Sequence, residues 1–548
     1  MVQDKTGAPA AAPAAVTPPE TTAATPRGAA FPGGLPARVA AAVAGGLALF
    51  LAFPPISLWF LAPLGIALLT LSVRGVRLRR ALWLGYVGGA AFLLPTLAWV
   101  RPIGYDAWAG LVAIESLYYA VMSVGVALVC RLRWWPLWAA CLWVPTEWAR
   151  GAFPFGGFPW ARVGFSQGES VFTPYAALGG VPLVTFAVAL CGTLIALTLA
   201  SVRRGQARDA GRSRGLTRLL ALPVAGALAV PLLAYAVQRP GGEGGRTVNV
   251  GIVQGNVPGR GMTPMGDEPA VVLRNHTGKL HEMAQAVREG KLPRPDLVAL
   301  PENSTDIDPY RDAYANATID AAVKDVGVPV LVGAVVAIGD EHRATRSLVW
   351  DPATGPGAFY DKQKLVPFGE FTPMKDIVLK LFQRANLVGR QSVAGDRDGD
   401  LRMGPVTVGA VNCYEVAFDG VVRGTVRAGG SPLVVQTNNA TYALTNLPPQ
   451  QLAMSQLRAV EHNRPVITAA TTGISAYVTP DGHVAWETRE LVPDMNVVTV
   501  PVRTELTIAT RVGAAPEWAL IALGAGAVAA AFWQGRRRRG ELAEGGDS

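Results

Sequence analysis

The chain has 548 residues, half of them hydrophobic, and a formal net charge of +9 at pH 7. It is too long for one ordinary domain. The hydrophobic residues gather before about residue 238 and again near the C-terminus, in runs of about 20 residues that can cross a bilayer. Arginines lie beside these runs, as topology signals do, so the positive charge does not indicate a nucleic-acid partner. Three of the four cysteines lie in apolar runs, and no disulfide framework is indicated.

The order of polar and apolar segments predicts a polytopic α-helical membrane domain with about eight spans. Residues 1–34 are rich in Ala, Pro and Thr and predict a disordered tail. Residues 35–238 predict a membrane domain of seven helices, 514–535 a last transmembrane helix, and 536–548 a cytoplasmic tail. The predicted spans lie near 37–53, 56–73, 81–100, 107–130, 133–148, 176–201, 218–237 and 515–534.

Arginine clusters predict which side of the membrane is the cytoplasm. With eight spans every cluster falls on one side, and the positive-inside rule assigns that side to the cytoplasm. Both termini are then inside, and the polar segment 240–510 is extracytoplasmic. The clusters are Arg74, Arg77, Arg79 and Arg80; Arg131 and Arg133; Arg203, Arg204, Arg208, Arg212, Arg214 and Arg218; and Arg536 to Arg539.

The polar segment 240–510 alternates strand and helix patterns. This alternation predicts an α/β domain whose sheets are covered by helices. The predicted strands lie near 248–254, 296–300, 328–336, 433–436 and 466–470, and the predicted helices near 269–289, 311–325 and 449–462.

Cys413 is the one cysteine in this polar segment. It follows an apolar, β-branched run and precedes a stretch, Val416 to Arg423, that can be read as a helix. A thiol at a strand-to-helix switch faces the positive end of a helix dipole, which favours the nucleophilic thiolate. A lone cysteine is more often a small packing residue, so its surroundings decide between the two interpretations.

Charged residues elsewhere in the segment could complete an acyl-transfer site. Such chemistry needs a base, a nucleophile and a fixed cation or N–H donors for the oxyanion. Glu302 follows a predicted buried strand, and Lys362 and Glu370 share one short stretch. Taken singly, charges such as Glu302 and Lys362 are more often solvated or paired than catalytic.

Three motifs resemble those of the nitrilase (carbon-nitrogen hydrolase) superfamily. They are Leu-Pro-Glu at 300–302, Tyr-Asp-Lys with Leu-Val-Pro-Phe-Gly-Glu at 360–370, and Asn-Cys-Tyr-Glu at 412–415. Together with the eight-span frame, and with Val-Gln-Gly-Asn at 253–256 and Gly-Phe-Pro-Trp at 157–160, they resemble the apolipoprotein N-acyltransferases. The resemblance implies a nitrilase-like αββα sandwich on a membrane base.

The resemblance also implies residue roles, with no metal and no cofactor. Glu302 would be the general base, Lys362 the oxyanion stabiliser and Cys413 the nucleophile. Lys364 stands where the family often has His, so the catalytic role is assigned to Lys362. The loop that carries Trp160 has two interpretations: an aromatic belt at the membrane interface, or a lid or lipid-headgroup contact of the site. The supporting or substrate-binding candidates are Glu370, Tyr414, Glu415, Trp160 and Arg162.

The implied activity is the last step of lipoprotein maturation at the cell (inner) membrane. A phospholipid would donate an acyl chain to Cys413 as a thioester, and the chain would pass to the N-terminal amine of a diacylated apolipoprotein. Membrane lipids are expected partners and nucleic acid is not. One alternative is a membrane-anchored nitrilase-type amidase, for which one anchor would suffice. The other is an inactive lipid- or lipoprotein-binding protein, against which the intact motifs argue.

Two segments depart from the family pattern. Residues 258–262 carry no Trp where the family often has one soon after the Gln-Gly-Asn motif. Residues 440–444, Ala-Thr-Tyr-Ala-Leu, stand in place of a Trp-Phe-Gly run. The sequence therefore does not decide whether the first segment contacts the substrate or how the acceptor docks at the second.

Overall fold

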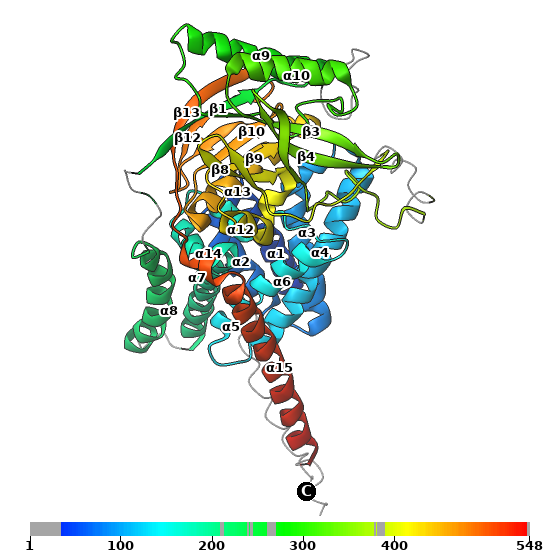
Figure 1. Cartoon of the computed structure of the whole chain (residues 1–548). Helices are drawn as coiled ribbons and strands as arrows, with labels where there is room; N and C mark the ends of the chain where they lie inside the picture. Colours follow the sequence, from blue (N-terminus) through cyan, green and yellow to red (C-terminus); the bar gives the residue numbers. More distant parts are fainter. Residues whose placement is uncertain are drawn as a thin grey trace, which may run out of the picture.

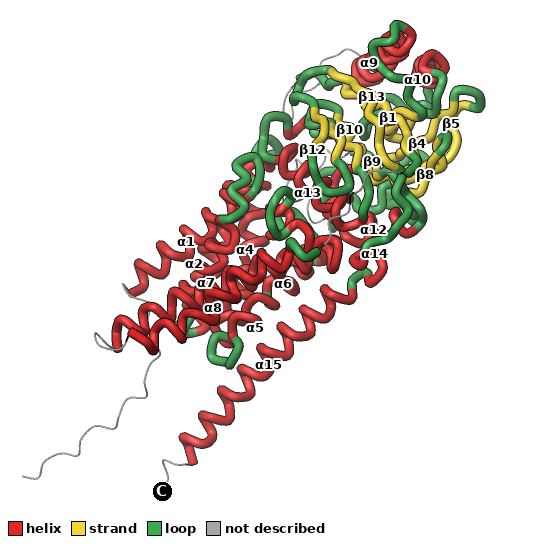
Figure 2. Tube along the Cα trace, turned by 90° about the vertical axis from the view of Figure 1, so that its left-hand side faces the viewer, coloured by secondary structure: helices red, strands yellow, loops and turns green. Residues whose placement is uncertain are grey.

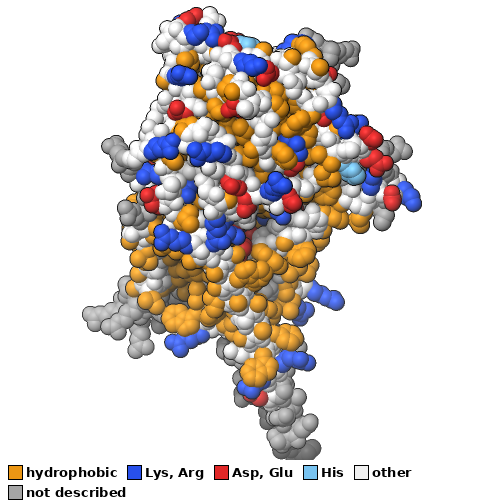
Figure 3. Space-filling model, viewed as in Figure 1, with side chains coloured by type: hydrophobic (Ala, Val, Ile, Leu, Met, Phe, Trp, Pro, Cys, Tyr) orange, Lys and Arg blue, Asp and Glu red, His pale blue; other side chains and the backbone are white. Residues whose placement is uncertain are grey.

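The computed structural model describes residues 34–208, 213–237, 241, 245–259, 270–376, 380 and 389–544. Residues 1–33 of the disordered tail predicted for 1–34, Arg212 and residues 260–262 lie outside this range, and Gly34 begins a helix. Within the described chain, a bundle of helices forms one end of the molecule and two β-sheets form the other (Figures 1 and 2). Hydrophobic side chains dominate the surface of the helical end, and charged side chains are more frequent over the sheets (Figure 3).

The helices of the bundle come from both ends of the chain. The long helix α7 contains non-helical residues at Gly179 and Gly180 and a proline at 182, so it is kinked near its start. The bundle helices are α1 (Gly34–Ala52), α2 (Leu61–Val73), α3 (Leu78–Thr96), α4 (Tyr105–Val129), α5 (Trp135–Cys141), α6 (Trp143–Ala152), α7 (Ala176–Arg208), α8 (Ser213–Ala234) and α15 (Ala515–Glu544).

Four helical segments are long and apolar enough to cross a membrane. They are Gly34–Ala52, Tyr105–Val129, Thr173–Val202 and Ala515–Arg537. Two shorter apolar helices accompany them, Leu61–Val73 and Ala221–Ala234. These helices make the chain a membrane protein by length and composition.

The structure gives more detail on two of the predicted spans. The span predicted near 133–148 consists of two short helices, α5 and α6, which meet at Leu142. The backbone angles of Leu142, φ −69° and ψ −17°, are still those of a right-handed helix, and apolar residues flank the junction on both sides, so hydropathy does not reveal it. The span predicted at 514–535 overlaps the apolar segment Ala515–Arg537, and α15 itself continues through the arginines to Glu544, because Arg, Leu, Ala and Glu are good helix formers.

The first sheet has the strand order β13-β1-β2-β3-β4-β5, with β6 paired to β4. Strands β1, β2 and β3 are parallel, the pairs β1–β13, β3–β4 and β4–β5 are antiparallel, and β6 pairs with β4 in parallel. The bounds are β1 (Thr247–Gln254), β2 (Leu297–Ala299), β3 (Val330–Ile338), β4 (His342–Asp351), β5 (Gly355–Asp361), β6 (Gln391–Ser392) and β13 (Asp494–Pro501).

The second sheet has the order β12-β11-β10-β9-β8-β7, with β8, β9 and β10 parallel. Parallel central strands are buried on both faces and read as continuous apolar runs, which is why their positions were predicted to within a few residues. The bounds are β7 (Asp400–Met403), β8 (Val406–Asn412), β9 (Leu433–Thr437), β10 (Val466–Ala470), β11 (Ala476–Val478) and β12 (Val484–Glu487).

Helices cover the outer faces of the two packed sheets. Residues of both sheets, among them Ile252, Leu331, Val408 and Val434, share one hydrophobic core. Helices α9 (Val271–Arg288) and α10 (Ala313–Val326) pack on the first sheet. Helices α12 (Asp419–Arg427) and α13 (Leu447–His462) pack on the second, and α13 also contacts α7 of the bundle. The second sheet therefore lies nearer to the bundle (Figure 1).

Gly333 on β3 allows the first sheet to approach the segment that carries Glu302. A Cβ atom at Gly333 would lie 2.0 Å from the carbonyl oxygen of Pro301 and 2.7 Å from Cα of Glu302. We expect Gly333→Ala to displace Glu302 and to lower the free energy of unfolding by about 1–3 kcal/mol. Thermal unfolding and activity should both show the loss.

Gly357→Ala on β5 is the matched control. Its Cβ would meet only the carbonyl oxygen of Val349, at 3.8 Å. A Gly333→Ala variant that was as stable and as active as Gly357→Ala would contradict this close approach.

Candidate active site

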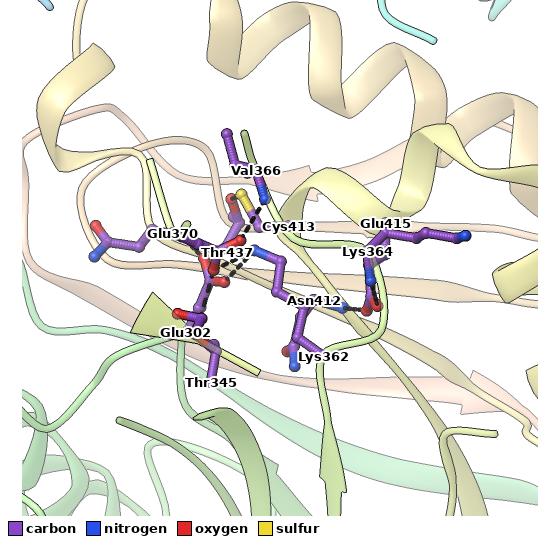
Figure 4. A network of polar contacts seen from close by, with 12 residues as sticks. Glu302, Thr345, Lys362, Lys364, Val366, Glu370, Asn412, Cys413, Glu415 and Thr437 are labelled. Carbon is purple, nitrogen blue, oxygen red and sulfur yellow. Dashed lines mark hydrogen bonds and ion pairs between the residues drawn. The ribbon is translucent and has the colours of Figure 1, made fainter. Parts of the chain in front are cut away.

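The predicted Glu, Lys and Cys converge where strands end. Glu302 comes shortly after β2, Lys362 directly follows β5, and Cys413 directly follows β8. Ligand sites of α/β sheets form at the carboxyl ends of strands, where several chain segments meet. In Figure 4, Glu302, Lys362 and Glu370 lie close to Cys413.

The Lys362 ammonium lies between two carboxylates. Its Nζ donates to Oε1 of Glu302 at 2.9 Å and to Oε1 of Glu370 at 3.0 Å. Its side chain is 2% exposed. Burial alone would lower the pKa of Lys362, but Glu302 and Glu370 outweigh it and raise the pKa well above its usual value. Lys362 is therefore a fixed cation.

Glu302 is a buried carboxylate with both oxygens engaged. Its Oε1 accepts from Lys362, and its Oε2 accepts from the backbone N–H of Asn438 at 3.0 Å. Burial raises the pKa of Glu302, Lys362 opposes that shift, and nearby Glu370 adds to it. A carboxylate with a raised pKa holds a proton more firmly, so Glu302 is better suited to general-base work than an exposed glutamate.

Glu370 is held in place by the stretch that also carries Lys362. Its Oε2 accepts from the backbone N–H of Val366 at 2.7 Å. Its Oε1 lies 3.3 Å from the hydroxyl of Thr345. Glu370 thus provides a second fixed carboxylate for the Lys362 ammonium.

Cys413 has a strained backbone and a half-buried side chain. Its φ of 48° lies in the left-handed region, uncommon for a side-chain-bearing residue. Its Sγ lies 3.2 Å from the hydroxyl of Thr437 and 3.5 Å from Nε2 of Gln451. Burial, followed by Glu302, raises the pKa of the thiol to about 11, although Lys362 opposes the shift.

The expectation that the fold itself favours the thiolate was wrong. A 3-10 turn, Cys413–Ala417, follows the nucleophile, and the next α-helix begins only at Asp419. No α-helix therefore begins at the thiol, and burial dominates instead. The resting group is a thiol that needs a base.

Glu415 ties the Cys413 segment to the Lys362 segment. One carboxylate oxygen accepts from the Tyr360 hydroxyl at 2.8 Å and from two backbone N–H groups, Gln363 at 2.6 Å and Lys364 at 3.0 Å. The other accepts from the backbone N–H of Asn412 at 2.8 Å. These four bonds occupy Glu415 and leave it poorly placed to act as the base.

Tyr414 and Trp160 join this site to the helical bundle. The Tyr414 hydroxyl donates to the carbonyl oxygen of Gly157 at 3.0 Å, and its ring stacks on Trp160 at 6.4 Å between centroids. Trp160 donates from Nε1 to Oε1 of Gln450 at 2.8 Å. Because Trp160 is 2% exposed, it is a wall of the site and not part of an aromatic belt at the lipid surface.

Arg162 lies in an ion-pair cluster. Its Nη1 donates to both carboxylate oxygens of Asp419, at 3.0 and 2.8 Å, and Asp419 also pairs with Arg458 at 2.7 Å. The two guanidinium groups outweigh burial and hold the pKa of Asp419 far below its usual value. Among the described residues, no partner of Arg162 contacts Cys413, Glu302 or Lys362.

Lys364 is exposed and extends away from Cys413 (Figure 4), with its ammonium 5.6 Å from the ring centroid of Phe418.

The sequence did not single out the two groups that contact the thiol, Thr437 and Gln451. Thr437 directly follows a strand predicted at 433–436, and a polar residue at that position is a usable signal. Gln451 sits in a predicted helix and carries none. In the described part of the chain, no group of three or more His, Cys, Asp or Glu residues could hold a metal ion.

The two sheets and this Glu-Lys-Cys arrangement define a carbon-nitrogen hydrolase domain on a helical membrane base. Residues 251–511 match the carbon-nitrogen hydrolase family, and residues 45–194 match the apolipoprotein N-acyltransferase N-terminal domain. The apolipoprotein N-acyltransferase of Mycolicibacterium smegmatis is 38% identical over 89% of this chain and 84% of its own. The chain belongs to the apolipoprotein N-acyltransferase family.

More distant proteins are also similar. The apolipoprotein N-acyltransferase of Azotobacter vinelandii is 29% identical over 81% of this chain and 85% of its own. Among solved structures, a cysteine-to-serine mutant of a Nesterenkonia AN1 amidase of the nitrilase superfamily covers 49% of this chain and 95% of its own, at 17% identity and a TM-score of 0.35. That structural likeness is too low to bear on function.

The raised pKa predicts how Cys413 reacts with alkylating agents. With a thiol pKa of about 11, reaction with iodoacetamide should be slow at neutral pH. The rate should rise about tenfold per pH unit up to the highest pH at which the protein stays folded, because only the thiolate reacts. Peptide mass spectrometry would distinguish Cys413 from the other cysteines. An alkylation rate that had already reached its plateau at neutral pH would contradict a thiol that is protonated at that pH.

Proposed function

We propose that this enzyme N-acylates the S-diacylglyceryl cysteine at the N-terminus of lipoproteins through an acyl thioester on Cys413, with a phospholipid as donor. The observation that carries the proposal is a thiol beside buried Glu302 and Lys362, walled by a loop of the membrane bundle. Family membership supports the acyltransferase activity and lipoprotein substrates. The kinetics would be ping-pong.

In the first half-reaction Glu302 takes the proton of the Cys413 thiol. The sulfur attacks the ester carbonyl of the phospholipid, and the Lys362 ammonium stabilises the oxyanion. The tetrahedral intermediate then expels the alcohol oxygen of the lysophospholipid, which receives the proton from Glu302. The products are the acyl thioester and a neutral alcohol.

In the second half-reaction the lipoprotein amine replaces the alcohol. Its nitrogen attacks the thioester carbonyl, and Glu302 accepts a proton from the nitrogen. The C–S bond breaks, an amide forms, and the proton returns from Glu302 to the sulfur. No metal or cofactor takes part in either step.

Two features favour transfer over release to water. Glu302 and Lys362 are 4% and 2% exposed, so the base and the cation are shielded from water. The loop that carries Trp160 belongs to the bundle and forms part of the site, whereas an anchored amidase would need only one helix. Both proposed substrates are lipid-anchored, and neither would have to leave the bilayer.

We further propose the layout predicted from the sequence. Seven spans within 35–238, one of them formed by α5 and α6 together, and one span at 514–535 would make eight spans in the cell membrane, with residues 536–548 in the cytoplasm. The domain at 240–510 would be an αββα sandwich on the extracytoplasmic face. Four long apolar helices, two shorter ones and the one-sided arginine clusters support this layout.

The remaining predicted site residues would act by positioning Glu302, Lys362 and Cys413 or the substrate beside them. Glu370 would fix Lys362, and Glu415 would hold the Lys362 and Cys413 segments together. Tyr414 and Trp160 would shape the wall against which the acyl chain lies. Arg162 would hold the domain on the bundle and would not contact substrate.

A test for the covalent intermediate distinguishes the three candidate functions, which are acyl transfer, amide hydrolysis and binding without catalysis. Phospholipid without a lipoprotein acceptor should leave one acyl group on Cys413, labile to hydroxylamine and visible as a mass shift on its peptide. A diacylated lipopeptide should discharge it onto the free amine. Cys413→Ala should show no adduct. Absence of an adduct while transfer proceeds would rule out the mechanism.

Labelling of single introduced cysteines tests the orientation. Lys291, whose side chain is 73% exposed, lies in the sheet domain. Arg79 is exposed on the first turn of α3. In intact cells a membrane-impermeant maleimide should label Lys291→Cys and not Arg79→Cys, and the opposite result would reverse the orientation.

A further inference from the structure

Three buried polar residues surround the Cys413 thiol and have no role in the reaction as set out above. They are Thr437 at the end of β9, Asn439 just after it, and Gln451 on α13. Their exposed fractions are 0%, 1% and 1%. Because water cannot satisfy groups this deeply buried, their polar atoms must bond to one another or to the thiol.

Two of these residues bring a hydrogen-bond donor to the sulfur. The hydroxyl oxygen of Thr437 lies 3.2 Å from Sγ, and the amide nitrogen Nε2 of Gln451 lies 3.5 Å from it. They reach the sulfur from different elements, β9 and α13. The two donors can therefore bind the sulfur at the same time.

Asn439 sets the direction of the Gln451 amide. Its Nδ2 donates to Oε1 of Gln451 at 3.1 Å. With the oxygen end of the amide engaged there, the N–H end faces the thiol. The helix that carries Gln451 is itself held by its neighbour Gln450, which accepts from Trp160 at 2.8 Å and donates to the carbonyl oxygen of Thr96 at 3.1 Å. The bundle thus helps to place the amide.

The Thr437 hydroxyl has one proton and three acceptors around it. Besides Sγ, these are Oδ1 of Asn439 at 2.8 Å and Oε1 of Gln451 at 2.9 Å. A hydroxyl can donate to only one of them at a time. A thiolate is a charged acceptor and forms the strongest of the possible bonds, so rotation of the hydroxyl toward the sulfur follows ionisation without any movement of the backbone.

We propose that Gln451 and Thr437 are further catalytic residues, which hold the Cys413 thiolate by one hydrogen bond each. The inference rests on the proposed function in taking Cys413 as the nucleophile. Both bonds favour the charged sulfur and so oppose the rise in the thiol pKa that burial and Glu302 cause. They lower the barrier to proton transfer onto Glu302.

Substitutions that keep volume and remove the donor test the proposal. We expect Gln451→Leu and Thr437→Val each to slow the alkylation of Cys413 by iodoacetamide about tenfold or more near pH 8, the size expected for one lost hydrogen bond to a charged group. Thr437→Ser keeps the hydroxyl and should retain most of the wild-type rate. The measurement uses the intact, detergent-solubilised protein and peptide mass spectrometry.

Gln456→Leu is the matched control on the same helix. Gln456 is buried, but its amide donates to Glu169 and to the carbonyl oxygen of Gly482. Its replacement should leave the alkylation rate of Cys413 unchanged. If Gln451→Leu does not fold, the comparison of Thr437→Val with Thr437→Ser carries the test.

Two results would overturn the proposal. One is a wild-type alkylation rate in folded Gln451→Leu and Thr437→Val. The other is slowing that appears with bulky N-ethylmaleimide but not with iodoacetamide, because this would indicate hindered access. The assay needs no lipid, so failure of the acyl-transfer proposal would appear separately, as wild-type protein that forms no thioester.

Discussion

The buried ammonium of Lys362 is the constraint on which the site depends. A buried cation is stable only when it is paired, and Lys362 lies within 3.0 Å of both Glu302 and Glu370. Burial raises the pKa of Glu302, Lys362 opposes that shift, and nearby Glu370 adds to it. The same burial that makes Cys413 a poor acid makes Glu302 a better base, so the two pKa values move in the same direction. The difference between the pKa of the Cys413 thiol and that of Glu302 is narrowed by hydrogen bonds to the thiolate. The donors at Thr437 and Gln451 matter because they would supply these bonds.

The bundle does more than anchor the sheets, because it supplies part of the site. Arg150 within the bundle pairs with Glu115 at 2.6 Å and donates to the carbonyl oxygen of Trp160 at 3.0 Å. The Trp160 ring stacks on Tyr414, the residue next to the nucleophile. Unbroken contacts therefore run from the bundle interior to Cys413, and the position of the thiol is set from the membrane side as well as from the sheet.

Much of this could be read from the sequence, and the exceptions have physical causes. Apolar β-branched runs predicted the buried strands, and the three motifs predicted which charges meet. The junction between α5 and α6 at Leu142 was missed because hydropathy is uniform across it. The ionisation state of Cys413 was misjudged because sequence position suggests a helix dipole but does not report burial. The pairing of Arg162 with Asp419 was not predicted because the two residues are 257 positions apart in the chain. Gln451 was missed because the pattern of a helix does not tell which buried polar residue faces a reactive atom.

The ion cluster at the junction follows the same logic as the site itself. Arg162 and Asp419 are 5% and 14% exposed, so their pairing adds little net stability after desolvation is counted. An arrangement that separated them would leave a buried charge unpaired, at a cost of about 3–5 kcal/mol. The cluster therefore disfavours alternative placements of the domain more than it stabilises the observed one. That property suits an enzyme whose thiol, base and bundle wall come from segments far apart in the chain, because proton transfer and attack on a carbonyl tolerate errors of only a fraction of an ångström.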